Sequence, residues 1–163
     1  MIKKSFWGVF FILVIFIIDR LTKIMVLKSA ETLGEVNILV TKFLSINLIW
    51  NEGIAFGLFS FDQKIYYNLI TSLIVFITLI ILWLASKSKG LEKFSYLIII
   101  GGSLGNLFDR LYYSSVIDFI DVSYNNFHWF IFNVSDIFIS LGVLFLIFLE
   151  LIDNQKNEID EEN

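Results

Sequence analysis

Phe127-His-Trp-Phe-Ile-Phe-Asn133-Val-Ser-Asp136 leads without a break into an apolar run at residues 137–149, and this junction decides the class of fold. Such a run suits the interior of a bilayer, where a carboxylate costs on the order of 2–3 kcal/mol even at the edge of the hydrocarbon. Asp118 lies in a similar place, just after an earlier apolar run. Carboxylates kept at this depth predict a functional site embedded in a membrane.

The composition supports a membrane protein. The chain has 163 residues, of which 57% are hydrophobic and only 17% charged, and its mean hydropathy is +0.79. A soluble domain of this length needs more charge to cover its surface. The net charge of −4 comes from residues 153–163, which hold five acids and one lysine, while the other eleven acids balance eleven bases. We therefore expect a solvated, disordered acidic tail and no nucleic-acid partner.

Metal and thiol chemistry have little support in the sequence. The chain has no Cys and a single His, His128, so thiolate sites, disulfides and a His-rich metal centre are excluded. We expect neither a cofactor nor a bound metal. His128 lies between Phe127 and Trp129, which favours a place in an interfacial aromatic belt.

Four segments are long and apolar enough to cross the hydrocarbon as helices. They predict an all-α membrane fold in which residues 1–152 form one domain, followed by the tail at 153–163. The first segment is interpreted as a retained helix because Asp19, Arg20 and Lys23 stand where a signal-peptide cleavage site would need small residues. The expected spans are residues 6–27, 65–85, 91–111 and 131–152.

Positive charge predicts the orientation of these spans. Basic residues on one side of a bilayer mark the cytoplasmic side, so both termini are expected there. Residues 28–64 and 112–130 then face outward, with Asp118 and Asp136 near the outer face. The lysines that carry this inference precede the first span or lie between the second and third: Lys3, Lys4, Lys87, Lys89 and Lys93.

The outer segment at residues 28–64 is expected to form a small extracytoplasmic β-cradle between the first two helices. Residues 36–40 and 44–48 are β-branched or alternate in polarity, and Gly34 and Gly53 bound them. Within the third span, Gly101 and Gly105 have the G-x-x-x-G spacing that predicts close packing between helices.

Three expected helices each present polar residues at helical spacing and at one membrane depth. Lys23 and Arg110 are predicted to neutralise Asp19 and Asp109 if these faces meet. A purely structural role, in which the polar faces hold the bundle together, remains an open alternative. The three sets are Asp19, Thr22 and Lys23; Asn106, Asp109 and Arg110; and Asn133, Asp136 and Ser140.

Asp118 and Asp136 differ from the other carboxylates because no base is near them in sequence. Two carboxylates in one pocket of low dielectric do not both ionise readily, so such a pair shares a proton and titrates as a unit. That arrangement is used in aspartic proteolysis, where one carboxylate activates water and the other protonates the carbonyl oxygen. Sequence spacing alone does not establish that the two side chains meet.

The chain resembles the lipoprotein signal peptidases (signal peptidase II) of bacterial inner membranes. Five stretches carry the resemblance, in the order found in the family and across nearly the whole chain outside the tail. They are Asp19-Arg-Leu-Thr-Lys23, Asn51-Glu-Gly-Ile-Ala-Phe-Gly57, Gly101-Gly-Ser-Leu-Gly-Asn-Leu-Phe-Asp-Arg110, Val116-Ile-Asp-Phe-Ile-Asp121 and Phe132-Asn-Val-Ser-Asp136.

The resemblance implies a four-helix membrane aspartyl endopeptidase in the inner membrane that cuts prolipoproteins just before a diacylglyceryl-modified Cys. We expect the lipidated precursor and membrane phospholipid as partners, and a monomer, although the sequence itself does not fix the oligomeric state. Asp118 and Asp136 match the catalytic pair, and Asp19 and Lys23 match its support on the first helix. Positions that line or brace the site are matched by Asn51, Gly53, Asn106, Asp109, Arg110 and Asn133.

One departure from the family pattern is Ser135, where Ala is usual. We expect a slight local change, with the hydroxyl bonding back to a helix carbonyl. Several aromatic residues of the outer segment are expected either to clamp the substrate at headgroup depth or to belong to an aromatic belt. They are Trp50, Phe56, Phe59 and Phe61.

Three other functions stay open from the residues. Intramembrane carboxylates also mark ion pathways, so a small transporter or proton-coupled channel is the main alternative. Four helices leave little room for alternating access, and the acids cluster at one depth instead of forming a relay. A non-catalytic factor that only binds precursors is the second alternative. A Ser–Lys peptidase using Lys23 is the third, and it would need an outer serine that the sequence does not identify.

Overall fold

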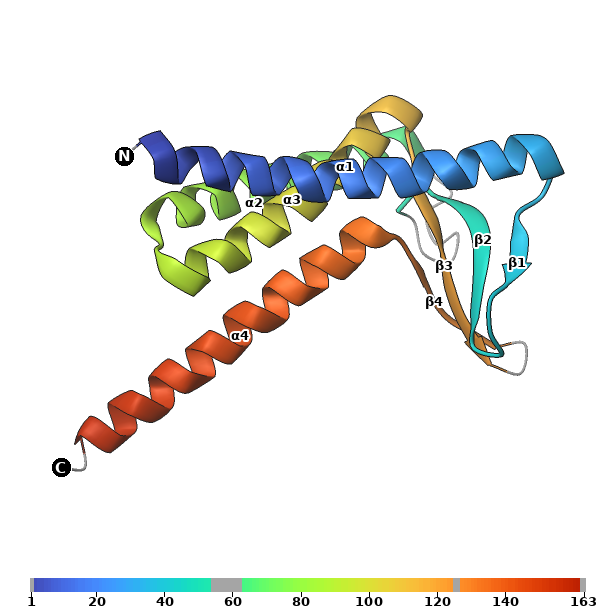
Figure 1. The fold of residues 1–163 in the computed structure, drawn as a ribbon. Coiled ribbons are helices and arrows are strands. Elements are labelled where there is room, and N and C mark those ends of the chain that lie inside the picture. Colours follow the sequence, from blue (N-terminus) through green and yellow to red (C-terminus); the bar gives the residue numbers. More distant parts are fainter. Residues whose placement is uncertain (1, 54–62, 125–126, 162–163) are drawn as a thin grey trace.

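The computed structural model describes the backbone of residues 2–53, 63–124 and 127–161. In that part of the chain it has four helices and a small antiparallel sheet, as the sequence predicts (Figure 1). The predictions for Phe56, Phe59 and Phe61 lie outside the described residues. The helices are α1 (Ile2–Leu33), α2 (Gln63–Lys87), α3 (Gly90–Tyr113) and α4 (Val134–Glu161).

The sheet is larger than expected and does not come from residues 28–64 alone. Its four strands lie in the order β1-β2-β3-β4 and every pair is antiparallel. Two strands come from the segment between α3 and α4, for which no strand was predicted. That segment supplies the inner strand β3, which pairs with β2 on one side and β4 on the other. The strands are β1 (Asn37–Leu39), β2 (Leu44–Asn51), β3 (Val116–Tyr124) and β4 (Phe127–Phe132).

The ends of α4 also differ from the prediction. Ile131 and Phe132 were assigned to the last helix, but they pair with Asp121 and Ile120 in the sheet, so α4 begins at Val134. At its other end α4 continues to Glu161, which makes most of the expected disordered tail helical. Residues 153–163 contain no Gly or Pro, so nothing in this segment breaks the helix.

Helix α3 lies at the centre of the bundle and contacts all three other helices. Its glycines allow these contacts: a Cβ built on Gly101 would lie 2.8 Å from the Cβ of Ile15 in α1. A Cβ on Gly102 would lie 2.6 Å from the backbone oxygen of Ser135 in α4. The close packing predicted from the G-x-x-x-G spacing is therefore confirmed.

Two stretches, Lys64–Lys87 in α2 and Val134–Asp153 in α4, are long and apolar enough to cross a membrane. Their apolar side chains face outward, as lipid contact requires; Leu69, for example, is 67% exposed. Helices α1 and α3 carry the charged groups that meet inside the bundle. The sheet lies at one end of the molecule, while the N-terminus and the α2–α3 turn lie at the other (Figure 1).

Candidate active site

A compact charge cluster joins α1 to α3 near the sheet. Lys23 Nζ lies 3.1 Å from Asp19 Oδ2 and 2.6 Å from Asp109 Oδ2. Arg20 bridges the same two carboxylates, with Nη2 2.8 Å from Asp19 Oδ2 and Nη1 2.6 Å from Asp109 Oδ1. Asp19, Lys23 and Asp109 are fully buried, so each charge needs these partners to offset its desolvation.

The second cation of this cluster is Arg20, and the prediction that Arg110 neutralises Asp19 or Asp109 is wrong. Arg20 follows Asp19 directly and its planar guanidinium reaches both carboxylates. Arg110 points instead toward α2, with its guanidinium carbon 5.4 Å from the ring centre of Tyr67. Its Nε and Nη1 atoms are buried and have no hydrogen-bond partner in the part of the chain that the structure describes.

Asp19 also fixes the start of α4. The backbone N–H of Ser135, in the first turn of that helix, donates to Asp19 Oδ1 at 3.0 Å. A carboxylate at a helix N-terminus satisfies a free N–H and opposes the positive end of the helix dipole. The Ser135 hydroxyl is buried with no hydrogen-bond partner among the described residues, so the expected bond to a helix carbonyl is wrong.

Gly105→Ala is expected to lower the free energy of unfolding by about 1–3 kcal/mol or more. The added Cβ would overlap Ser135 Oγ and lie 2.6 Å from Asp19 Oδ2, where neither neighbour can move freely. Gly8→Ala is the matched control, since its Cβ would meet only Leu97 at 3.5 Å. Thermal unfolding in detergent measures both variants. Equal stability of the two would show that the α1–α3–α4 junction is loosely packed.

Asp118 on β3 and Asp136 in the first turn of α4 meet through asparagines. Asp118 accepts hydrogen bonds from Asn51 Nδ2 at 2.8 Å and from Asn133 Nδ2 at 2.6 Å. Asp136 accepts from Asn106 Nδ2 at 2.7 Å and from the backbone N–H of Asn133 at 3.0 Å. Within the described part of the chain neither carboxylate has an ion pair, as their sequence context predicts.

The three asparagines are locked in the orientation that points an NH₂ group at a carboxylate. An amide can be flipped unless its oxygen is also bound, and here each oxygen accepts from a fixed donor. Asn106 thereby links the charge cluster to Asp136. The bonds run from Lys23 Nζ to Asn106 Oδ1 at 3.1 Å, from Gly53 N to Asn51 Oδ1 at 2.7 Å, and from Asp136 N to Asn133 Oδ1 at 3.1 Å.

Gly53 is needed for its backbone conformation and for its size. Its φ of 76° lies in the left-handed region that L side chains rarely adopt, and this turns its N–H toward Asn51. A Cβ at this position would lie 3.0 Å from a guanidinium nitrogen of Arg110. Gly53 therefore holds the side chain of Asn51 through its N–H, and Arg110 occupies the space that a side chain at Gly53 would need.

Burial sets the protonation of Asp118, whose side chain lies outside the helical segments. The residue is 3% exposed, and this desolvation raises the pKa of Asp118 from its usual 3.8 to about 6. That value is a net result, to which the amides of Asn51 and Asn133 contribute by lowering the pKa and the charge of Asp136 by raising it. A lysine or arginine beside the pair would favour the ionised form of both carboxylates. Neutral amide donors hold the two groups in place without this effect.

The raised pKa of Asp118 predicts a pH-dependent stability difference between wild type and Asp118→Asn. Folding favours the protonated carboxyl, so wild type loses stability as pH rises from about 4 to above 6. The loss amounts to about 3 kcal/mol and is absent from the variant. Unfolding in denaturing detergent at pH 4 and pH 8 measures it. A difference between the two proteins that does not change with pH would contradict this origin.

Another buried carboxylate, Asp121, forms a separate cluster on the sheet. It is fully buried, and its Oδ2 lies 3.3 Å from Ser45 Oγ, 2.6 Å from Asn47 Nδ2 and 2.7 Å from His128 Nδ1. His128 therefore binds Asp121, and its side chain is half-exposed on β4 between Phe127 and Trp129. Sequence reasoning missed this cluster because Ser45 and Asn47 lie more than 70 residues from Asp121. Only the β2–β3 register brings them together.

Three residues singled out in the sequence stand apart from the pair. Thr22 Oγ1 donates back to the carbonyl oxygens of Ile18 and Asp19, and Ser140 is exposed. Trp50 is 46% exposed, with its ring 5.6 Å from that of Tyr113. The described residues hold no group of three His, Cys, Asp or Glu arranged for a metal ion.

Comparison with known proteins places this site in a family. Residues 11–152, which include every residue of the charge cluster and the pair, match the family described as signal peptidase (SPase) II. A lipoprotein signal peptidase of Pelagibacter ubique (strain HTCC1062) is 46% identical over 99% of this chain and 97% of its own. That of Wigglesworthia glossinidia brevipalpis is 41% identical over 84% of this chain and 89% of its own.

The fold is shared with solved structures of bacterial membrane enzymes. Two solved structures of bacterial membrane enzymes, each 25% identical to this chain, superpose with TM-scores of 0.69 and 0.71. They cover 91% and 88% of this chain, and the chain covers 90% and 92% of theirs. With a family match over most of its length and relatives that align nearly end to end, the chain belongs to the signal peptidase II family.

Proposed function

We propose that this protein is an aspartic endopeptidase that removes signal peptides from prolipoproteins, with Asp118 and Asp136 as its catalytic pair. One observation carries the assignment of the pair. The two carboxylates are joined through Asn133, are held only by amide and backbone donors, and have no cation paired to either within the described residues. This is the environment in which one proton is shared between two acids.

The chemistry follows from one ionised and one protonated carboxyl. The ionised group takes a proton from a water molecule as the water oxygen attacks the carbonyl carbon of the scissile bond. The protonated group gives its proton to the carbonyl oxygen, which forms a neutral tetrahedral intermediate. When this intermediate collapses, the C–N bond breaks and one of its two hydroxyl groups gives a proton to the carboxylate that is now ionised. The other carboxyl group passes the proton that it took from water to the leaving amine.

The charge cluster is proposed to position this pair. Asp19 holds the first turn of α4, which carries Asp136, and Lys23 orients Asn106 toward the same carboxylate. Lys23 itself is a poor candidate for a Ser–Lys base. Its ammonium already contacts two carboxylates and an amide oxygen, and no serine hydroxyl among the described residues bonds to it.

Cleavage of a lipidated precursor by the purified protein tests the proposed function. We expect release of the signal fragment just before the diacylglyceryl-modified Cys, and far slower cleavage of the same precursor without its lipid. A transporter or a non-catalytic assembly factor would leave the precursor intact. Intact precursor after incubation with folded protein would therefore overturn the assignment.

We also propose that the protein crosses a bacterial inner membrane four times, with both termini in the cytoplasm. The enzyme acts as a monomer. The lysine-rich α2–α3 turn and the sheet lie at opposite ends of the molecule (Figure 1), which suits the positive-inside rule. We expect reporter fusions at Ser88 to report the cytoplasm and those at Lys42 the outer side. A periplasmic signal at Ser88 would place Asp118 on the wrong face.

A further inference from the structure

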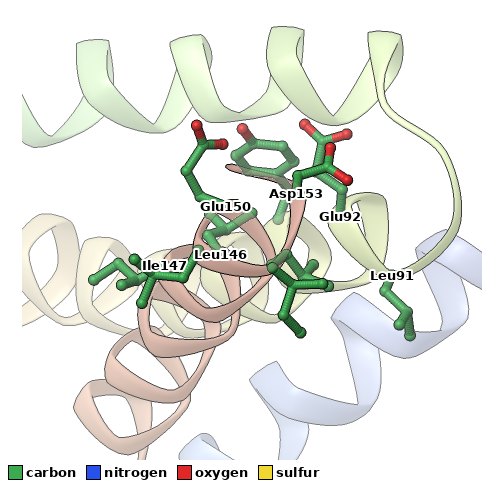
Figure 2. A pocket seen from close by; sticks show the side chains of 10 residues that line it. Leu91, Glu92, Leu146, Ile147, Glu150 and Asp153 are labelled. Carbon is green, nitrogen blue, oxygen red and sulfur yellow. The ribbon is translucent and has the colours of Figure 1, made fainter. Parts of the chain in front are cut away.

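Two cavities flank the first turns of α3, at the end of the molecule opposite the sheet. One lies between α3 and α4 and has a volume of about 650 Å³. Figure 2 shows that the carboxylates of Glu92, Glu150 and Asp153 gather on one side of it. This cavity is distant from the catalytic pair, and its negative charge repels anions.

The second cavity lies between α1 and the α2–α3 turn and has a volume of about 690 Å³, within the usual range for a ligand pocket. We call it the basic groove. Its wall is apolar and largely aromatic, and its rim carries a hydroxyl and two ammonium groups. The wall consists of Trp7, Phe10, Phe11, Phe94 and Leu97, and the rim of Ser88, Lys89 and Lys93.

Two lysines give this rim a positive charge. Within the described residues neither Lys89 nor Lys93 takes part in an ion pair. The acid of the same turn, Glu92, accepts a hydrogen bond from Ser88 Oγ at 2.7 Å and lines the acidic cavity on the other side of α3. Glu92 thus lies between the two cavities, bonded to a hydroxyl of the basic groove, while Lys89 and Lys93 line the groove itself.

With the four spans of the proposed function, the basic groove also lies at the depth of lipid headgroups. The apolar stretch of α2 ends at Lys87, so Ser88 and Lys89 follow at the edge of the hydrocarbon. Phe11 and Phe94, whose ring centres are 4.7 Å apart, continue the groove toward the centre of the bundle. A cationic rim above an apolar wall complements a ligand with a phosphate at one end and an acyl chain at the other.

We propose that the basic groove binds an anionic phospholipid, with its phosphate between Lys89 and Lys93 and an acyl chain against Phe11, Phe94 and Leu97. Zwitterionic lipid offers the same chain without net charge, so the two lysines provide the selectivity. Each lysine near an anionic lipid strengthens binding roughly fivefold. The site is independent of the peptidase chemistry, which takes place at the opposite end of the molecule.

Quenching of Trp7 fluorescence tests this site directly. Phosphatidylglycerol and phosphatidylcholine with the same brominated acyl chains are titrated into the purified full-length protein in detergent. Subtracting the signal of Trp7→Phe removes the contribution of the other tryptophans. We expect phosphatidylglycerol to quench Trp7 at concentrations at least tenfold below those that phosphatidylcholine requires.

Matched variants identify the groups responsible. Lys89→Ala combined with Lys93→Ala should weaken phosphatidylglycerol binding roughly 25-fold and bring it close to phosphatidylcholine. Lys42→Ala removes an exposed lysine from the sheet end and should leave the preference unchanged. Phe94→Ala should weaken both lipids. Equal quenching by the two lipids in wild type, or an undiminished preference in the double lysine variant, would overturn the proposal.

Discussion

Asp118→Asn and Asp136→Asn are each expected to lower the rate of precursor cleavage by on the order of 10⁴-fold or more. Asn keeps the size of the side chain, but it neither accepts a proton from water nor delivers one to the carbonyl oxygen. The double variant should be about as inactive as either single variant, because the two groups act as one unit. Cleavage of lipidated precursor, with folding checked by thermal unfolding, measures all three.

The choice of control for this experiment depends on the structure. Asp121 belongs to the same strand as Asp118, but it is fully buried and bonded to Asn47 and His128, so Asp121→Asn perturbs the sheet. Asp153→Asn is the better matched control because that carboxylate is exposed at the far end of α4. Near-normal turnover by Asp118→Asn or Asp136→Asn, or loss of activity in Asp153→Asn, would be incompatible with the proposed pair.

Lys23→Ala should lower the free energy of unfolding by roughly 3–5 kcal/mol, because it removes a buried cation shared by two buried carboxylates. Arg20 alone then faces both Asp19 and Asp109, and it is partly accessible to solvent. Unfolding in detergent, compared with wild type at neutral pH, provides the measurement. A stability close to wild type would mean that water or Arg20 compensates both carboxylates.

Arg110→Ala should destabilise the protein less than Lys23→Ala. Its guanidinium has no carboxylate partner in the described part of the chain; it lies against the ring of Tyr67, and a Cβ added at Gly53 would meet it. The comparison separates two ways of stabilising the bundle, because Lys23 neutralises buried acids whereas Arg110 packs against Tyr67. The reverse order of stability would restore Arg110 as the main counter-ion.

The helical part of the fold and the close helix contacts could be predicted from local pattern. Long apolar segments and the G-x-x-x-G spacing need only neighbouring residues to be informative. The strand β3 could not be predicted in this way, because its alternation of acids and apolar residues is short. Its place inside the sheet also depends on β2, which lies about 70 residues away. Long-range pairing likewise hid the cluster around Asp121.

Within the candidate site, charge balance separated Asp118 and Asp136 from the other acids, and the structure brings their binding partners together. Charge balance did not show which arginine joins Lys23 in the cluster with Asp19 and Asp109. Arg20 and Arg110 have the same charge and lie beside an Asp in sequence, and only the rotation of α1 against α3 decides which of them reaches both carboxylates. The part played by Asn133, which contacts both acids, likewise depends on the β4–α4 junction.

A structure of the protein with a peptide-like inhibitor that carries a hydroxyl in place of the scissile carbonyl tests the central claim most directly. Such a hydroxyl occupies the position of the tetrahedral oxygen during hydrolysis. We expect it to lie within about 3 Å of a carboxylate oxygen of both Asp118 and Asp136. An inhibitor bound beside Asp121 and His128, or one whose hydroxyl contacts only one acid of the pair, would contradict the account.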